Sequence, residues 1–395
     1  MCEVDVSRGA PQVHRWDPIA RVRAERPAAF DVLLSGSVFF DIVFTDLPAT
    51  PAPGTEVWAG GMGSSPGGVA NLAVAAARLG LHTALAAAFG DDVYGTWCWE
   101  VLERDEGIDL SRSRRFPGTH SAVTVSIATG GDRAMVTHGH PAPVGVDELV
   151  GAPPTVRAAF AELTLADPEP WWHRAADAGA LVFADLGWDP TGAWDPAVLA
   201  GLDRCHAFLP NSAEAMAYTR ADTPIAAARA LAERVPLAVV TCGADGVVAV
   251  ESATGTEVQV PRVPVNAIDA TGAGDVFGAA LVVGTLAAWP LPDRLAFASL
   301  AAALAVQQFG GSLAAPGWGD IADWWHEART GADADLVRRY EFLDGILPSG
   351  PVDAVRRAEA TLTASSHLPT TRSGTERRSP RRVLRSNPTT RQGEA

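Results

Sequence analysis

The stretch Asn266-Ala-Ile-Asp-Ala-Thr-Gly-Ala-Gly-Asp275 is followed directly by the apolar run Val276 to Ala288, which has the length of a helix. The amides of a helix's first turn have no partner within the helix, and the helix dipole favours negative charge there. Because Gly272, Ala273 and Gly274 have small side chains or none, their amides can surround an anion such as a phosphoryl group. Asp275 falls in the same turn, where its carboxylate could accept a proton from an attacking hydroxyl. The alternative interpretation is a glycine turn with an aspartate that only caps the helix.

A second glycine segment, Ser65-Pro-Gly-Gly-Val-Ala-Asn-Leu-Ala73, opens an alanine-rich helix that we predict from about Val69 to Leu79. Gly67 and Gly68 permit a close approach of the backbone to a ligand, and Asn71 offers a donor and an acceptor suited to vicinal sugar hydroxyls. A glycine turn before an ordinary helical asparagine is again the alternative. The Gly-x-Gly-x-x-Gly spacing of dinucleotide sites is not met after a strand here.

Around these segments, apolar runs of strand length alternate with alanine-rich segments of helical length from Asp31 onward, the first run being Val32 to Phe44. This alternation predicts an α/β fold with three layers, α/β/α, around a mostly parallel central sheet. Two stretches break the pattern. Residues 45–63 are rich in Pro and Gly, and residues 119–137 read as two strands around a Gly-Gly-Asp turn. We expect these stretches to form a small β flap over one end of the sheet.

The alternating apolar runs also indicate the domain organisation, because they begin near Asp31 and end near residue 330. We predict an N-terminal extension at residues 1–30, one α/β domain at residues 31–330 and a C-terminal extension at residues 331–395. From about residue 365 the sequence is rich in Ser, Thr, Pro and Arg without apolar periodicity, which predicts disorder. A solvated tail and a polyanion-binding tail are both open interpretations of this basic stretch.

Charge and composition exclude several function classes. The 395 residues hold 31 Lys+Arg against 46 Asp+Glu, a formal net charge of −15, so we expect no nucleic-acid or membrane partner. The sequence contains no lysine, which excludes phosphate loops and Schiff-base sites that need an ε-amine. Scattered cysteines, no secretory signal and no apolar run of spanning length predict a cytoplasmic location. His138-Gly-His140 has a metal-like spacing, but we expect both histidines to face solvent because no third ligand is near in sequence.

The two glycine segments, in this order, resemble the two signature regions of the PfkB carbohydrate kinases, the ribokinase-like family. Residues 269–275 are similar to the family's Asp-Thr-Thr-Gly-Ala-Gly-Asp, with Ala270 in place of a small hydroxyl residue. Gly187 stands where many relatives carry an asparagine. The resemblance covers about residues 32–328, and its further landmarks are Gly36-x-x-x-x-Asp41, Gly90-Asp-Asp-Val-Tyr-Gly95, Asn211-Ser-Ala-Glu214 and Thr241-Cys-Gly-Ala-Asp-Gly246.

This resemblance implies a ribokinase-like fold and an enzyme that phosphorylates a hydroxyl of a small sugar or sugar-like acceptor, with ATP and Mg²⁺ as cofactors. Asp275 would be the catalytic base, and Gly272, Ala273 and Gly274 would form the anion hole. The sugar hydroxyls would be held by Asp41, Gly67, Gly68 and Asn71. Asn211 and Glu214 would organise Mg²⁺ through water. The nucleotide would be bound by these two residues together with Thr241, Gly243, Gly246, Asp269 and Thr271.

Two rival functions stay open at this point: a nucleoside kinase, and a non-catalytic sensor that binds a sugar or nucleotide. The sequence does not decide which acceptor is used or whether it already carries a phosphate, although Arg112, Arg114, Arg115 and Arg133 near the flap could clamp one. Monovalent-cation dependence is also open, and so is a homodimer formed through the flap.

Overall fold

The computed structural model describes residues 17–129, 132–165, 169–187, 189, 191–348, 352 and 355–358. Its strands are β1 (Phe30–Ser35), β2 (Val38–Thr45), β3 (Gly61–Gly68), β4 (Thr83–Ala86), β5 (Ala88–Gly90), β6 (Arg114–Phe116), β7 (Ala122–Thr129), β8 (Asp132–His138), β9 (Val156–Glu162), β10 (Leu181–Asp185), β11 (Ala207–Phe208), β12 (Leu237–Thr241), β13 (Val247–Glu251) and β14 (Thr256–Val260). Its α-helices are α1 (Ala20–Glu25), α2 (Val69–Arg78), α3 (Val93–Glu100), α4 (Val146–Val150), α5 (Trp171–Asp177), α6 (Ser212–Thr219), α7 (Pro224–Ala232), α8 (Ala273–Leu286), α9 (Leu291–Ala305), α10 (Trp318–Ala328) and α11 (Ala334–Tyr340). A π-helical turn, η1 (Val101–Asp105), follows α3, and short 3₁₀ helices are η2 (Pro196–Arg204), η3 (Gly243–Asp245), η4 (Gly311–Ala314) and η5 (Glu341–Gly345).

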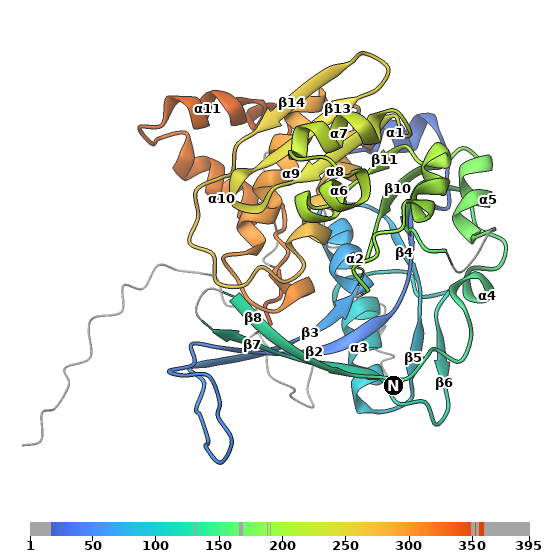
Figure 1. Ribbon diagram of the computed structural model, residues 1–395, viewed down its shortest axis with the longest axis vertical. Coiled ribbons are helices and arrows are strands. Elements are labelled where there is room, and N and C mark those ends of the chain that lie inside the picture. The colour runs from blue at the N-terminus through green and yellow to red at the C-terminus, as the bar shows by residue number, and fades with distance from the viewer. Residues whose placement is uncertain are drawn as a thin grey trace, which may run out of the picture. The chain divides into compact units, whose positions relative to one another are not determined.

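The central sheet has the order β14-β13-β12-β11-β10-β9-β1-β4. The strands from β12 to β4 pair in parallel, and β13 and β14 continue the sheet in antiparallel pairing. Helices cover both faces of this sheet (Figure 1). The structure therefore confirms the predicted three-layer α/β/α architecture with a mostly parallel sheet.

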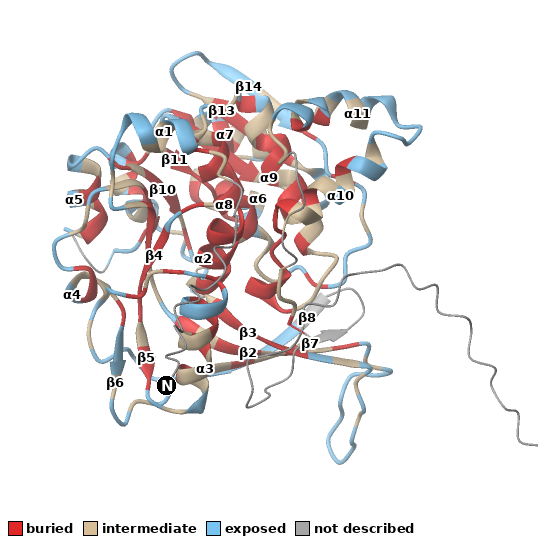
Figure 2. Ribbon diagram, turned by 180° about the vertical axis from the view of Figure 1, so that it is seen from behind, coloured by how far each residue is buried: buried red, intermediate tan, exposed pale blue. Residues whose placement is uncertain are grey.

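The two faces of the sheet build two hydrophobic cores. On β1, Val32 and Leu34 belong to a buried cluster with residues of α2, α8 and α9. Leu33, which points to the opposite face, belongs to a second cluster with residues of α5 and α7. This alternation is what a strand covered on both faces requires. The buried residues are concentrated in the sheet and in helices such as α2 and α8 (Figure 2).

A four-stranded sheet of order β3-β2-β7-β8 forms the flap at one end of the domain (Figure 1). The run Val32 to Phe44, expected as one strand, is in fact two strands that belong to two different sheets. Gly36 separates them with a φ of +154°, a conformation that favours glycine. Asp41 therefore lies on flap strand β2 and not on the first strand of the central sheet.

The described parts of both extensions pack against the domain. Ile19 is only 1 % exposed, and the Arg23 guanidinium pairs with Asp31 at the start of β1. On α11, the Tyr340 hydroxyl donates to the Ala296 carbonyl at 3.1 Å. Residues 365–395 lie outside the described residues, so disorder there stays a prediction. In the part of the chain that is described, no helix combines the length and the apolar character that crossing a membrane requires.

Candidate active site

The carboxyl ends of the parallel strands and the starts of two helices meet at one edge of the central sheet. Glu162 ends β9, Asp185 ends β10 and Thr241 ends β12, while Asn211 follows β11. In open α/β sheets this edge is the one at which ligands bind. Helices α2 and α8 begin close together there, because Asn71 in the first turn of α2 contacts Asp275 in the first turn of α8.

Helix α8 starts in the conformation that an anion-binding turn requires. Gly272 is its N-terminal cap and has a φ of +74°, which disfavours any residue with a side chain. The Ala273 amide donates to the Ala270 carbonyl at 3.3 Å, a long bond, so this predicted anion-hole amide already has a partner. At Gly274, a Cβ atom would have no neighbour within 4 Å, so there is open space beside this turn.

Asp275 and Asn71 join the two helix starts. The Asn71 side-chain amide donates to Oδ2 of Asp275 at 3.1 Å. Burial raises the pKa of Asp275 to about 6, while the hydrogen bond from Asn71 acts in the opposite direction. Near pH 7 most of this carboxylate is ionised yet basic enough to accept a proton.

The face of the flap that carries Asp41 is polar. Ser65, Asp41, Thr124 and Thr137 stand opposite one another in a row across the four strands. A Cβ atom at Gly67 would lie 1.9 Å from Oδ2 of Asp41, so the Asp41 carboxylate lies directly over the Gly67 backbone. Glycine at this position is what makes that approach possible.

Three buried side-chain oxygens near this face lack hydrogen-bond partners among the described residues. They are Ser65 Oγ, Asn71 Oδ1 and Ser126 Oγ. Buried polar atoms are normally paired, and exceptions often mark the place of a ligand or of water. Ser65 and Asn71 share a neighbour, because a Cβ atom at Gly311 would lie 3.6 Å from Ser65 Oγ and 2.9 Å from Asn71 Oδ1.

A group of carboxylates missed by the sequence analysis lies at the strand ends. Burial raises the pKa of Asp185 well above its ordinary value, and the negative charges of Glu214, Asp275 and Glu162 raise it further. Glu162 stands opposite Asp185 in the β9–β10 pairing. A Cβ atom at Gly187 would lie 3.0 Å from Oε1 of Glu162, so the glycine leaves this carboxylate uncovered. The available signal was the position of Glu162 and Asp185 at the carboxyl ends of parallel strands.

Asn211 and Glu214 form a reciprocal cap at the start of α6. The Glu214 amide donates to Asn211 Oδ1 and the Asn211 amide donates to Glu214 Oε2, each at 3.0 Å. Burial raises the pKa of Glu214, and the hydrogen bonds from Asn211 lower it. No cluster of three or more His, Cys, Asp or Glu among the described residues is placed to hold a metal ion. The donor set, oxygens of carboxylates and one amide, is the kind that hydrated Mg²⁺ accepts.

The predicted nucleotide-binding turn lies next to this cap. Asn211 and Thr241 form a parallel bridge, and the Thr241 amide donates to the Pro210 carbonyl at 3.1 Å. Gly243 and Gly246 both have positive φ, +53° and +92°. A Cβ atom at Gly246 would lie 2.1 Å from the Val260 carbonyl oxygen, whereas one at Gly243 would meet nothing within 4 Å.

Asp269 and Thr271 brace the turn before α8. Oδ1 of Asp269 accepts from the Thr271 amide at 2.9 Å and from the Thr271 hydroxyl at 2.6 Å. Oδ2 of Asp269 accepts a long bond of 3.4 Å from the Gly310 amide. These contacts give Asp269 a structural part in shaping the turn.

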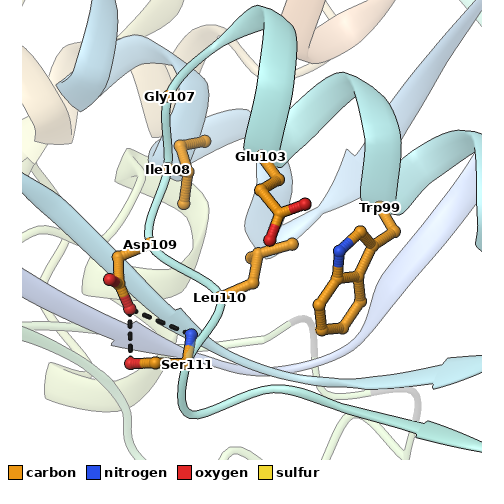
Figure 3. A pocket seen from close by; sticks show the side chains of 7 residues that line it. All are labelled: Trp99, Glu103, Gly107, Ile108, Asp109, Leu110 and Ser111. Carbon is orange, nitrogen blue, oxygen red and sulfur yellow. Dashed lines mark hydrogen bonds between the residues drawn. The ribbon is translucent and has the colours of Figure 1, made fainter.

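Two other features lie apart from this constellation. A cavity of about 420 Å³ is lined by the end of α3, by η1 and by the chain that follows, with none of the predicted site residues (Figure 3). His138 and His140 are exposed, as expected, and the fold brings a third ring, His120, to centroid distances of 5.6 and 6.3 Å from them.

Comparison with known proteins gives a consistent result. The family described as pfkB family carbohydrate kinase matches residues 32–317. The chain is 28 % identical over 294 residues to the ribokinase of Bacillus subtilis (strain 168), covering 71 % of this chain and 94 % of that protein. It is 32 % identical over 267 residues to the fructokinase of Klebsiella pneumoniae, covering 63 % and 85 %.

Solved structures show the same fold. A putative ribokinase from Agrobacterium tumefaciens aligns with a TM-score of 0.63 at 22 % identity, over 76 % of this chain and 99 % of that one. A putative ribokinase II from E. coli, in complex with ATP and Mg²⁺, aligns with a TM-score of 0.63 at 19 % identity, over 75 % and 99 %. Arabidopsis thaliana ribokinase, complexed with ribose and ATP, aligns with a TM-score of 0.59 at 22 % identity, over 75 % and 98 %.

Proposed function

Because this chain belongs to the pfkB carbohydrate kinase family, whose members are phosphotransferases with an alcohol group as acceptor, we propose that it transfers the γ-phosphoryl group of ATP to a hydroxyl of a small sugar. The observation that carries the proposal is the pairing of Asp275 and Asn71 at the start of α8. This pairing puts a base beside amides that can receive an anion.

In the proposed reaction, Asp275 accepts the proton of the acceptor hydroxyl as the oxygen attacks the γ-phosphorus. The bond from the γ-phosphorus to the bridging oxygen of ATP breaks, so that ADP leaves. The amides of Gly272 and Gly274, at the positive end of the α8 dipole, stabilise charge on the phosphoryl oxygens. Asn71 holds the carboxylate in place through its hydrogen bond to Oδ2. Phosphoryl transfer depends mainly on such positioning and charge stabilisation.

The acceptor is assigned to the polar face of the flap. Asp41 and Asn71 are suited to vicinal hydroxyls, and Gly67 and Gly68 leave the backbone open to a ligand. Ser65 and Ser126 add buried hydroxyls that lack partners among the described residues. A ligand rich in hydroxyls satisfies these groups, whereas an apolar ligand leaves them unpaired at a cost of about 1–3 kcal/mol each.

The nucleotide is assigned to the turn Thr241–Gly246 and to Asp269 and Thr271. Mg²⁺, when bound with ATP, neutralises phosphate charge. Asn211 and Glu214 are the residues that would hold it through water. Glu162 and Asp185 add carboxyl oxygens at the same edge of the sheet. This oxygen-rich surrounding suits a hard cation that keeps several of its waters.

An acceptor without a phosphate fits the site better, because three of the four arginines that could clamp a phosphate have other partners. The Arg112 guanidinium donates to the Val150 carbonyl at 2.9 Å, and that of Arg114 pairs with Glu148. The Arg115 guanidinium stacks over the Trp99 ring at 4.7 Å. The side chain of Arg133 lies outside the described residues.

We also propose a homodimer formed through the other face of the flap. That face carries Ile42 and Val125, which are half-buried, and Val136, which is 70 % exposed. These aliphatic side chains stand in register across β2, β7 and β8. Two copies can join such uncharged faces without electrostatic repulsion. Light scattering tests this, with Val136→Glu expected to give a monomer and a wild-type monomer overturning the proposal.

An ADP-release assay with ATP, Mg²⁺ and a panel of sugars and nucleosides tests the main function. We expect turnover with a free sugar and its loss in Asp275→Asn. Turnover confined to nucleosides would instead indicate a nucleoside kinase. Saturable sugar binding without ADP release across the panel would indicate the non-catalytic sensor and contradict the proposal.

A further inference from the structure

After its last helices the chain returns to the free edge of the flap. The Ala358 carbonyl accepts a hydrogen bond from the Ser64 amide at 3.1 Å. Ser64 lies on β3, an edge strand of the flap sheet, so this bond adds the segment to that edge. Ala358 is 1 % exposed, although it lies beyond residue 317, where the family match ends.

The apolar side chains of this segment fill places left by glycines. A Cβ atom at Gly310 would lie 2.2 Å from Cβ of Ala358, and one at Gly317 would lie 2.7 Å from Cγ1 of Val355. Neither distance allows a side chain at the glycine. The segment and the two glycines therefore fit one another closely, as parts of a packed core do.

Two arginines, one of them buried, fix the same segment. Arg78, at the end of α2, is 3 % exposed in its side chain, pairs with Glu106 and donates to the Arg356 carbonyl at 2.8 Å. The Arg356 guanidinium pairs with Asp105 and lies 5.6 Å from the centre of the Trp97 ring. The bond from Arg78 links the segment to α2, the helix whose first turn carries Asn71.

The segment is one layer away from the proposed acceptor site. Gly310, against which Ala358 packs, is followed by Gly311, at which a Cβ atom would lie 2.9 Å from Asn71 Oδ1 and 3.6 Å from Ser65 Oγ. The next residue, Ser312, donates its hydroxyl to the Pro66 carbonyl on β3. Ala358 thus supports, from behind, the turn that touches the acceptor-facing groups.

We propose that residues 355–358 form a strap that positions the acceptor side of the site. The strap holds the Gly310-Gly311 turn against Asn71 and fixes the edge of β3, the strand that carries Ser65 and Gly67. Its members are positioning residues, since none of them reaches the reacting atoms. The assignment of the acceptor side rests on the proposed function, whereas the contact between strap and flap does not.

Two truncations test the strap. A chain ending at Ala364 keeps the strap and removes only the basic tail, whereas a chain ending at Leu347 removes both. In hydrogen exchange without ligands, we expect the Ser64 amide to exchange about 10-fold faster in the shorter chain and unchanged in the longer one. The sugar KM should rise about 10-fold in the shorter chain, with a smaller change in the ATP KM.

A point substitution covers the case in which the shorter chain does not fold. Ala358→Leu forces a larger side chain against Gly310, while Ala358→Gly adds no atom there and serves as the control. We expect Ala358→Leu alone to raise the sugar KM and the Ser64 exchange rate. Unchanged Ser64 exchange would show that the strap contact does not form, and faster exchange with an unchanged sugar KM would overturn the positioning role. If no variant and no wild-type protein releases ADP, the proposed function fails, but the exchange result still decides whether the strap exists.

Discussion

The Asn71 amide and the Asp275 carboxylate, 3.1 Å apart, join the first turns of α2 and α8 at the edge of the central sheet. Two opposing effects act on the pKa of Asp275 in this pair. Burial raises the pKa of Asp275 to about 6, and the hydrogen bond from Asn71 limits that rise. A base tuned in this way is ionised near neutral pH and still basic enough to take a proton.

This balance predicts the pH dependence of turnover. The working form of Asp275 is ionised, so we expect kcat/KM for the sugar to fall as the pH drops through about 6. Asn71→Ala removes a donor that favours the ionised form, so the pKa rises and the acid limb moves to higher pH. Ser126→Ala is the control, because it removes an acceptor-facing hydroxyl and is expected to lower kcat/KM without moving the limb. An acid limb in the same place in Asn71→Ala would contradict the coupling.

Asp275→Asn separates chemistry from folding. Loss of the base should lower kcat by about 10²–10⁴-fold while ATP binding is retained. An aspartate whose pKa is raised in the folded state favours unfolding once the pH exceeds its unfolded value, near 3.8. At pH 7 the variant should therefore be at least as stable as the wild type in thermal unfolding. Near-normal kcat in this variant would overturn the assignment of the base.

Sequence reasoning located much of the fold because strand-length and helix-length runs alternate clearly. It did not anticipate β9, since Val156-Arg-Ala-Ala-Phe-Ala-Glu162 is alanine-rich and lacks a strand's usual alternation. For that reason Glu162 was missed. Sequence reasoning also merged β1 and β2 into one strand. The chain changes direction sharply at Gly36, and this single glycine is the only local sign of that change.

Contacts between residues far apart in the chain are the second limit on prediction from the sequence. The family resemblance placed Asn71 and Asp275 in one active site, but their hydrogen bond was not predicted, because nothing local to either residue specifies it. The packing of Ala358 against Gly310 had no signal at all: a small residue beyond the periodic part of the chain looks the same whether it is buried or free. Such contacts depend on the completed tertiary structure.

The nucleotide turn offers a matched pair of substitutions. Gly243 and Gly246 both have positive φ, so alanine costs about 1–2 kcal/mol of backbone strain at either position. Only at Gly246 would the new Cβ strike backbone, at 2.1 Å from the Val260 oxygen. We expect Gly246→Ala to lower kcat/KM for ATP by about 10²-fold, and Gly243→Ala to leave it nearly unchanged. Equal effects in steady-state kinetics would exclude this steric account.

The buried ion pair of Arg78 and Glu106 predicts a large effect on stability. Arg78→Ala removes the guanidinium that pairs with the buried Glu106 carboxylate and that donates to the Leu313, Ala315 and Arg356 carbonyls, so we expect it to destabilise the fold by about 3–5 kcal/mol. Arg104→Ala breaks the exposed pair with Glu100 and should cost about 0–1 kcal/mol. Urea unfolding curves of the two variants measure both values. If Arg78→Ala lowers the free energy of unfolding by less than Arg104→Ala does, the buried pair contributes little to stability.

The substitution Gly67→Ala tests whether Asp41 binds the acceptor sugar. An added Cβ would lie 1.9 Å from Oδ2 of Asp41, so Gly67→Ala must push the carboxylate out of its position. The φ of Gly67 is not positive, so the substitution adds a steric clash without left-handed strain. We expect kcat/KM for the sugar to fall about 10²-fold, mainly through KM, while the KM for ATP changes little. Gly145→Ala is the matched control, because a Cβ there meets nothing within 4 Å and its φ is −71°. If both KM values rise together in Gly67→Ala, the substitution has disturbed the whole edge of the sheet and Asp41 has no specific role in binding the acceptor.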